Sequence, residues 1–307
     1  MTEPADQPVP AKPGRSLTGF YVAICVLLVL GLLGAWLLTA SNRWWFDAYG
    51  AQRQQAEASR QLGVPVEKVV DLGGGVALEL VLVPAGRFQM GSPEDEKERG
   101  YDEAQHWVRI TRPFYMGKYE VTQEVWEKVM GTNPSLFKGA KNPVEGISWD
   151  DCQDFLKKLN ALEKEQGAFR LPTEAEWEWA CRAGTKTRFC SEDADGGLSD
   201  FAWYDANSGG TAHPVGAKHP NAWGLFDCHG NVLEWCQDWY GKDYYGKSAK
   251  DDPVGPATGS HRVLRGGSWY NPSAQCHSAT RGDYAPYTRP YNYGGLRVLV
   301  AVPSRGP

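Results

Sequence analysis

The chain has 307 residues, a formal net charge of -5 and a sequence pI near 5.7. An acidic chain with no long run of basic residues is not expected to bind nucleic acid. Its 35 Gly, 20 Pro and 13 Trp interrupt regular elements and supply large aromatic surfaces for burial, which favours a loop-rich domain over a helical bundle or a wound α/β sheet.

The first predicted element is a transmembrane helix. Residues 1–16 are polar and rich in Pro, which predicts a disordered tail, and residues 17–40 contain no charged side chain. A run of about 24 residues can span a hydrocarbon core of about 30 Å. A cleaved signal peptide is the alternative, but Leu38 fits poorly three residues before the only suitable cleavage site, after Ala40. We therefore expect a single-pass protein that contacts the membrane through residues 17–40.

Basic residues flank this helix on both sides, so the distribution of positive charge does not by itself set its orientation. Lys12 and Arg15 precede it, and Arg43 and Arg53 follow it. The short tail has no large mass to translocate, which favours a cytoplasmic tail and a domain outside the cytoplasm. In a bacterium, the protein would lie in the cytoplasmic membrane with its C-terminal domain in the periplasm or outside the cell. Residues 41–68 would form a juxtamembrane stalk.

A single folded domain is predicted over residues 69–303. It opens with β-forming residues on both sides of a Gly-Gly-Gly turn at 73–75, which predicts a hairpin. Beyond Gly184 the pattern is typical of loops and short strands. No repeat of 20–50 residues was found, which argues against a solenoid or a propeller.

Three helices are predicted in the first half of this domain. Amphipathic patterns over residues 122–130 and 149–162 predict the first two. The third follows Pro172, where Thr173 can cap the helix and Glu176 can complete a capping box.

Seven segments of the domain occur in the order typical of a known family. They are LVPAGRFQMGS (82–92), FYMGKYEVTQEVWEKVM (114–130), NPVEGISWDD (142–151), FRLPTEAEWEWACRAGT (169–185), PNAWGLFDCHGNVLEW (220–235), RVLRGGSWYNPSAQC (262–276) and YGGLRVLVA (293–301). Through these segments the chain resembles the formylglycine-generating enzyme (sulfatase-modifying factor) family. The resemblance implies an α+β, C-type-lectin-like fold with little regular secondary structure. It also implies one of several roles, since the family contains oxidases that convert a sulfatase cysteine to formylglycine, relatives attached to iron-dependent sulfoxide synthases, and ligand-binding domains that include variable proteins diversified by retroelements.

The copper site of the oxidases is incomplete in this chain. In those enzymes two cysteines separated by four residues follow the RGGS segment and hold copper(I) through soft thiolates. Here Asn271 stands in place of the first cysteine, and Cys276 falls at the spacing of the second, although a gapped alignment would move it. Leu233 replaces a tryptophan that lines the oxidase active site. We therefore expect neither copper nor formylglycine generation, and Cys276 and Ser268 remain the candidates for any catalytic role.

A calcium loop is the second feature that the resemblance implies. In the segment DCHGNVLE the positions of the family's ligands are occupied by Asp227, Gly230, Val232 and Glu234. Two carboxylates and two backbone carbonyls are hard oxygen ligands suited to structural Ca²⁺. The alternative is a tight turn in which Glu234 forms a salt bridge.

The cysteines and histidines give weaker signals. Six cysteines lie beyond the membrane segment, and an oxidising compartment would permit disulfides. The resemblance suggests a bond between Cys181 and Cys276, with free buried thiols as the alternative. No HxH or HxxxH spacing occurs, so the histidines are interpreted as surface or hydrogen-bonded loop residues, although distant loops could still bring some of them together.

An aromatic and polar cluster lies between the RGGS and GGLR segments, where the family has its substrate groove or variable ligand surface. Tyr, Asn and Arg side chains offer contact area and hydrogen bonds for protein or glycan recognition, and the alternative is that several pack in the core. Arg265 and Arg281 are expected to brace the interior by contacting carbonyls and carboxylates. The candidate ligand or partner surface consists of Trp269, Tyr270, Asn271, Tyr284, Tyr287, Arg289, Tyr291 and Asn292.

These features favour a non-catalytic, calcium-stabilised binding or accessory domain, tethered to the membrane and docked on a partner protein or membrane complex. One alternative is a divergent metal-dependent oxidoreductase that acts on a peptide cysteine through Cys276. A second is a diversified ligand-binding receptor.

Overall fold

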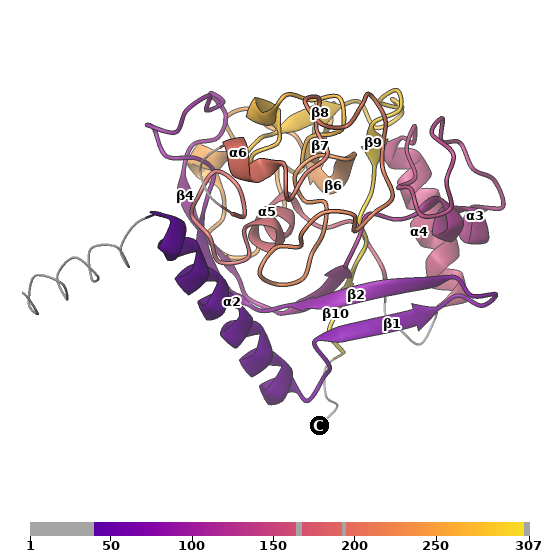
Figure 1. Cartoon of the computed structure of the whole chain (residues 1–307), viewed down its shortest axis with the longest axis horizontal. Coiled ribbons are helices and arrows are strands. Elements are labelled where there is room, and N and C mark those ends of the chain that lie inside the picture. The colour runs from indigo at the N-terminus through magenta and orange to yellow at the C-terminus, as the bar shows by residue number, and fades with distance from the viewer. Residues whose placement is uncertain (1–39, 164–167, 192–194, 304–307) are drawn as a thin grey trace, which may run out of the picture. The chain divides into compact units, whose positions relative to one another are not determined.

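The computed structural model describes residues 40–163, 168–191 and 195–303 (Figure 1). The predicted tail, 1–16, and all but the last residue of the predicted transmembrane helix, 17–40, lie outside these residues. Among the residues described, no helix combines the length and the apolar character needed to cross a membrane.

Short strands and helices are separated by long loops, as the composition predicts. The helices are α2 (Ala40–Leu62), α3 (Gln123–Met130), α4 (Trp149–Leu162), α5 (Glu174–Arg182) and α6 (Asp195–Leu198), with 3₁₀ turns at Tyr245–Lys247 and Ser273–Gln275. The strands are β1 (Glu67–Asp71), β2 (Ala77–Val83), β3 (Gly86–Met90), β4 (His106–Ile110), β5 (Phe114–Gly117), β6 (Leu233–Trp239), β7 (Arg262–Arg265), β8 (Gly282–Tyr284), β9 (Gly294–Gly295) and β10 (Leu299–Ala301). The expected loop-rich α+β fold is confirmed.

Three sheets organise the described part of the domain. The first has the strand order β1-β2-β5-β10, the second pairs β3 with β4, and the third has the order β8-β7-β6-β9. The predicted hairpin is confirmed, since β1 and β2 pair antiparallel around the glycine turn, with Glu67 opposite Val81. In the third sheet only β6 and β9 run parallel.

The C-terminal part of strand β2 in the first sheet is buried on both faces. Alternate residues of a strand point to opposite sides, so Val81 and Val83 join a core with α5, whereas Leu80 and Leu82 join a core with α3 and α4. The α5 helix also packs against strands of the second and third sheets, and it lies near the centre of the domain in Figure 1.

The three predicted helices are confirmed, and so is the capping box predicted for the third. Thr122 accepts a hydrogen bond from the Val125 N–H at the start of α3. At α5, the Glu176 N–H donates to Thr173 Oγ1 while the Thr173 N–H donates to the Glu176 carboxylate, which forms the reciprocal capping box.

The segment expected to be a stalk packs on the domain. From Ala48 onward α2 places small and polar side chains against the first sheet, and Ala51 is buried. Gln55 Nε2 donates to the carbonyls of Leu82 and Trp223, at 2.9 Å each, and Trp223 Nε1 donates to the Ala51 carbonyl at 3.0 Å. This part of residues 41–68 therefore belongs to the packed surface of the domain.

Candidate functional site

The loop after RGGS is closed by its own polar side chains. Ser268 Oγ donates to Asn271 Oδ1 at 2.6 Å, and Asn271 Nδ2 donates to Gln275 Oε1. The Asn271 N–H also donates to the Ser268 carbonyl at 3.0 Å. The amide that stands in place of a copper-binding cysteine therefore holds the turn together.

The Cys276 thiol lies beneath this loop and is fully buried. A Cβ atom added to Gly267 would lie 2.5 Å from Cys276 Sγ, which shows how closely the backbone covers the sulfur. Burial raises the pKa of Cys276 to about 12. The thiol is thus protonated and shielded, the opposite of the exposed, low-pKa setting of a reactive cysteine.

The bond suggested between Cys181 and Cys276 is not formed, because both residues carry free thiols. Cys181 Sγ instead lies 3.8 Å from the Cys228 carbonyl and 3.7 Å from His229 Nε2. His229 bridges the two segments, since its Nδ1 lies 2.7 Å from the Cys276 carbonyl. The cysteines of this region are held by packing and hydrogen bonds.

Glu234, a predicted calcium ligand, forms a buried ion pair. The Arg297 guanidinium contacts both of its carboxylate oxygens, at 2.6 to 3.0 Å, and the Trp177 indole N–H donates to Oε2 at 2.7 Å. Arg297 and Glu234 are 0% and 1% exposed at their side chains. These residues do not fit a calcium ion held through Glu234 unless Arg297 is displaced, so the salt-bridge alternative describes Glu234.

Asp227 is the other carboxylate of the predicted calcium loop, and it is buried near the same arginine. Its Oδ2 accepts a hydrogen bond from the Gly216 N–H at 2.7 Å, while its Oδ1 has no hydrogen-bond partner among the described residues. Glu120, which the sequence did not single out, lies beside this loop and accepts from the Val232 N–H and from Asn231 Nδ2. Burial raises the pKa of Glu120 and of Asp227.

The raised pKa of Asp227 predicts a pH effect on stability. Burial moves this pKa from 3.8 to about 6, so the folded state holds the proton more tightly than the unfolded chain does. This stabilisation is present below about pH 4 and is lost as the pH rises through about 6, a loss of about 3 kcal/mol for a shift of about two units. We expect Asp227→Asn to remove that loss while keeping an acceptor for Gly216. Urea unfolding of both proteins at about pH 4 and about pH 7.5 measures it, and parallel pH dependence in the two would contradict it.

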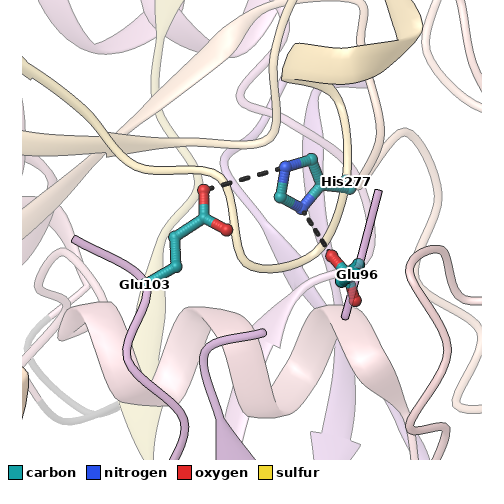
Figure 2. A group of neighbouring side chains, drawn as sticks. All are labelled: Glu96, Glu103 and His277. Atoms are coloured by element: carbon teal, nitrogen blue, oxygen red, sulfur yellow. Dashed lines mark ion pairs between the residues drawn. The ribbon is translucent and has the colours of Figure 1, made fainter. Parts of the chain in front are cut away.

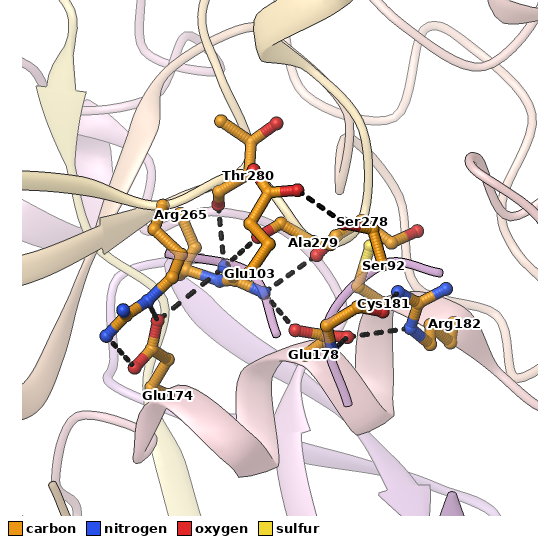
Figure 3. A network of polar contacts seen from close by, with 12 residues as sticks. Ser92, Glu103, Glu174, Glu178, Cys181, Arg182, Arg265, Ser278, Ala279 and Thr280 are labelled. Carbon is orange, nitrogen blue, oxygen red and sulfur yellow. Dashed lines mark hydrogen bonds and ion pairs between the residues drawn. The ribbon is translucent and has the colours of Figure 1, made fainter. Parts of the chain in front are cut away.

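Arg265 is at the centre of a second buried network (Figure 3). Its guanidinium pairs with Glu178 at 2.5 Å and donates to the carbonyls of Ser278, Ala279 and Thr280, at 2.7 Å each. Arg281 likewise pairs with Glu174 at 2.7 Å. The prediction that Arg265 and Arg281 brace the interior is confirmed.

The predicted ligand surface divides into a frame and three open tyrosines. In the frame, Trp269 Nε1 donates to the Asn292 carbonyl at 2.8 Å, Tyr284 and Tyr293 join their hydroxyls at 3.1 Å, and Arg289 forms a two-pronged pair with Asp151. Asn271 closes its own loop, as described above. We call the three open residues the tyrosine surface; they are Tyr270, Tyr287 and Tyr291, which are 65%, 76% and 81% exposed.

Two contacts tie the segments that carry the tyrosine surface to the rest of the domain. Tyr270 stacks on Tyr293, with ring centroids 6.2 Å apart, and this contact places it beside the segment that carries Tyr291. The Asp150 N–H donates to the Pro286 carbonyl, which fixes the segment before Tyr287 to the start of α4. Exposed aromatic rings on a fixed backbone are suited to recognising another molecule.

A cluster of Glu96, Glu103 and His277 was not identified from the sequence (Figure 2). His277 Nδ1 lies 3.4 Å from Glu96 Oε1, and its Nε2 lies 3.7 Å from Glu103 Oε1. Burial lowers the pKa of His277 to about 3, with a further contribution from Arg188, and burial raises the pKa of Glu103. Residues so far apart in the chain form no spacing motif, so sequence patterns carried no signal for this cluster.

Comparisons with known proteins cover most of the domain. Residues 75–302 match the sulfatase-modifying factor enzyme 1-like domain. The chain is 32% identical over 242 residues to the chaperone protein LppX of Paenibacillus barcinonensis, covering 63% of this chain and 79% of that protein. It is 33% identical over 184 residues to the formylglycine-generating enzyme of Streptomyces coelicolor, covering 55% of this chain and 56% of the enzyme. Among solved structures, Treponema denticola variable protein 1 matches with a TM-score of 0.72 and 32% identity, over 78% of this chain and all of that one. The matched region is only 33% of the kinase Pkn1 of Chlamydia pneumoniae, another relative.

Proposed function

Since this chain belongs to the family of sulfatase-modifying factor enzyme 1-like domains, we propose that it is a binding or accessory member without the copper-dependent oxidase activity. In this proposal residues 17–40 anchor it in a bacterial cytoplasmic membrane, and the domain lies on the periplasmic side. From there it docks on a partner protein or a membrane complex. Calcium is not part of the proposal, because Arg297 engages Glu234.

The observation that carries this proposal is the burial of the Cys276 thiol. A copper(I) pair needs two accessible thiolates. Here one position is Asn271, whose amide closes the loop, and the other is a fully buried thiol with a raised pKa. The geometry favours a loop that maintains its shape over one that exchanges a metal and a substrate thiol.

The tyrosine surface supports a binding role. Tyrosine offers a large contact area at a small cost in conformational entropy, and its hydroxyl adds a hydrogen bond. Three such side chains are more than half exposed on a framed surface. The relative LppX is by name a chaperone protein, which also favours an accessory role.

A second candidate is a ligand-binding receptor that uses the same surface. It is favoured by the similarity to Treponema denticola variable protein 1, which this chain matches over that protein's whole length. A divergent oxidoreductase acting through Cys276 gains no support from the described geometry.

Photo-crosslinking tests the proposed docking surface. A photoreactive phenylalanine analogue replaces Tyr291 in the full chain, in the cells that make the protein, and a matched variant carries it at Tyr101. Both tyrosines are well exposed, at 81% and 75%, but Tyr101 lies outside the tyrosine surface. We expect a discrete crosslinked product from position 291 and none of that mass from position 101.

Two results would count against the proposed function. One is the same product from both positions, which would show that the tyrosine surface is not selective. The other is copper-dependent oxygen consumption with a cysteine peptide that disappears in Cys276→Ser, because that activity would make the protein an oxidase.

A further inference from the structure

We propose that Glu96, Glu103 and His277 form a structural binding site for a divalent transition metal of the zinc class. One oxygen from each glutamate and one ring nitrogen of the histidine lie within 4.8 Å of one another (Figure 2). The two glutamates precede β4, and the histidine follows the 3₁₀ turn at Ser273–Gln275. The site would be independent of the tyrosine surface and of the proposed function.

The contacts within this cluster are longer than hydrogen bonds. The nitrogen–oxygen separations of 3.4 and 3.7 Å exceed the usual range of about 2.7–3.2 Å. His277 is 1% exposed, and its Nδ1 has no hydrogen-bond partner among the described residues. A buried imidazole nitrogen is expected to have a partner, and Figure 2 shows this one directed at the Glu96 carboxylate.

The spacing suits a small ion. Zinc binds histidine nitrogen and carboxylate oxygen at about 2.0–2.2 Å, so its ligand atoms lie roughly 3–4 Å apart. The observed spread, up to 4.8 Å, needs only a small contraction around an ion. One imidazole and two carboxylates form a mixed nitrogen and oxygen set, which favours a transition metal over calcium.

The arginines around the cluster pair with carboxylates outside it, beginning with Arg188, which pairs with Glu98. Arg182 and Arg265 pair with Glu178, and Arg281 pairs with Glu174. Glu103 is 3% exposed and accepts a hydrogen bond from Ser92 Oγ at 2.8 Å, but it forms no ion pair with an arginine in the part of the chain described. A divalent ion bound to these side chains would tie the loop before β4 to the segment after Cys276.

Cobalt and zinc binding to the full chain test the site. The chain is first freed of metal with a chelator, and Co²⁺ or Zn²⁺ alone is then added. We expect one ion per chain, a weak visible Co²⁺ spectrum without thiolate charge-transfer bands, and a higher melting temperature with Zn²⁺. His277→Gln and Glu103→Gln should weaken binding by about 100-fold or more, since each removes a direct ligand.

The matched control is His261→Gln. His261 also faces a carboxylate, Asp283 at 3.6 Å, but this pair is exposed, at 45% and 37% of the side chains. The control should bind the ion as the wild type does. Glu96 is more exposed than the other two ligands, so Glu96→Gln is the variant to test if His277→Gln and Glu103→Gln fail to fold. It should also weaken metal binding.

Three results would overturn the proposal. The first is that no ion binds to the wild type, which would make the cluster a buried ion bridge only. The second is one-to-one binding that survives in Glu96→Gln and His277→Gln. The third is a cobalt spectrum with thiolate bands, because the ion would then lie among the cysteines.

Discussion

Replacing Arg265 with methionine is expected to lower the free energy of unfolding by about 3–5 kcal/mol, the range for removing one partner of a buried ion pair. The side chains of Arg265 and Glu178 are both 0% exposed. The substitution would leave the Glu178 carboxylate with Arg182 as its remaining charged partner. It would also remove the donor to the carbonyls of residues 278–280. Urea unfolding of the full chain at neutral pH measures the effect.

Arg289→Met is the matched control for this experiment. Arg289 makes a two-pronged ion pair with Asp151, but its side chain is 62% exposed. Exposed pairs contribute about 0–1 kcal/mol, so we expect this variant to unfold close to the wild type. Equal losses at the two positions would mean that burial does not set the strength of the Arg265 network.

The Arg265 network and the shielded thiol belong to the same local structure. The carbonyls that Arg265 holds begin at Ser278, two residues after Cys276. The Ser278 N–H donates to the Arg188 carbonyl, so both sides of this segment are fixed. A loop held in this way keeps Cys276 under Gly267 and away from solvent.

Local sequence patterns predicted the helices well. The apolar spacing of residues 122–130 and 149–162, and the Thr173 and Glu176 capping pair, depend only on neighbours within a few positions. The turn at 73–75 likewise lies between the two strands that it joins. Seven ordered segments indicated the family, which the match over residues 75–302 confirms.

Pairings between distant residues could not be predicted in the same way. Glu234 matched a ligand position, but Arg297, which engages it, lies 63 residues further along the chain. The docking of α2 depends on Gln55 and Trp223, 168 residues apart. A charged residue in a motif does not reveal whether an ion or an arginine will neutralise it, because the fold selects the partner.

Replacing Gly230 with alanine is expected to destabilise the domain by about 4 kcal/mol or more, at the extreme of single substitutions. Gly230 has a φ of +102°, and an added Cβ would lie 2.1 Å from the Trp203 carbonyl oxygen. That carbonyl cannot move aside easily, because it accepts the Asn231 N–H at 2.7 Å, while the Gly230 N–H is bound to the Gly266 carbonyl at 2.7 Å. The variant should therefore either unfold at much lower urea or fail to accumulate as folded protein.

Gly224→Ala separates this clash from backbone strain. Gly224 also has a positive φ, +85°, but the nearest atom to an added Cβ is a methyl carbon of Val81, 4.0 Å away. In Gly224→Ala the only expected cost is therefore that of an alanine in the left-handed conformation, which lowers the free energy of unfolding by about 1–2 kcal/mol. If the two variants lose the same stability, the Trp203 carbonyl moves away from the added Cβ with no further loss of unfolding free energy. The loop around Gly230 is then more flexible than its hydrogen bonds indicate. If Gly230→Ala loses much more, the loop from Asp227 to Glu234 owes its shape to close backbone packing around Gly230.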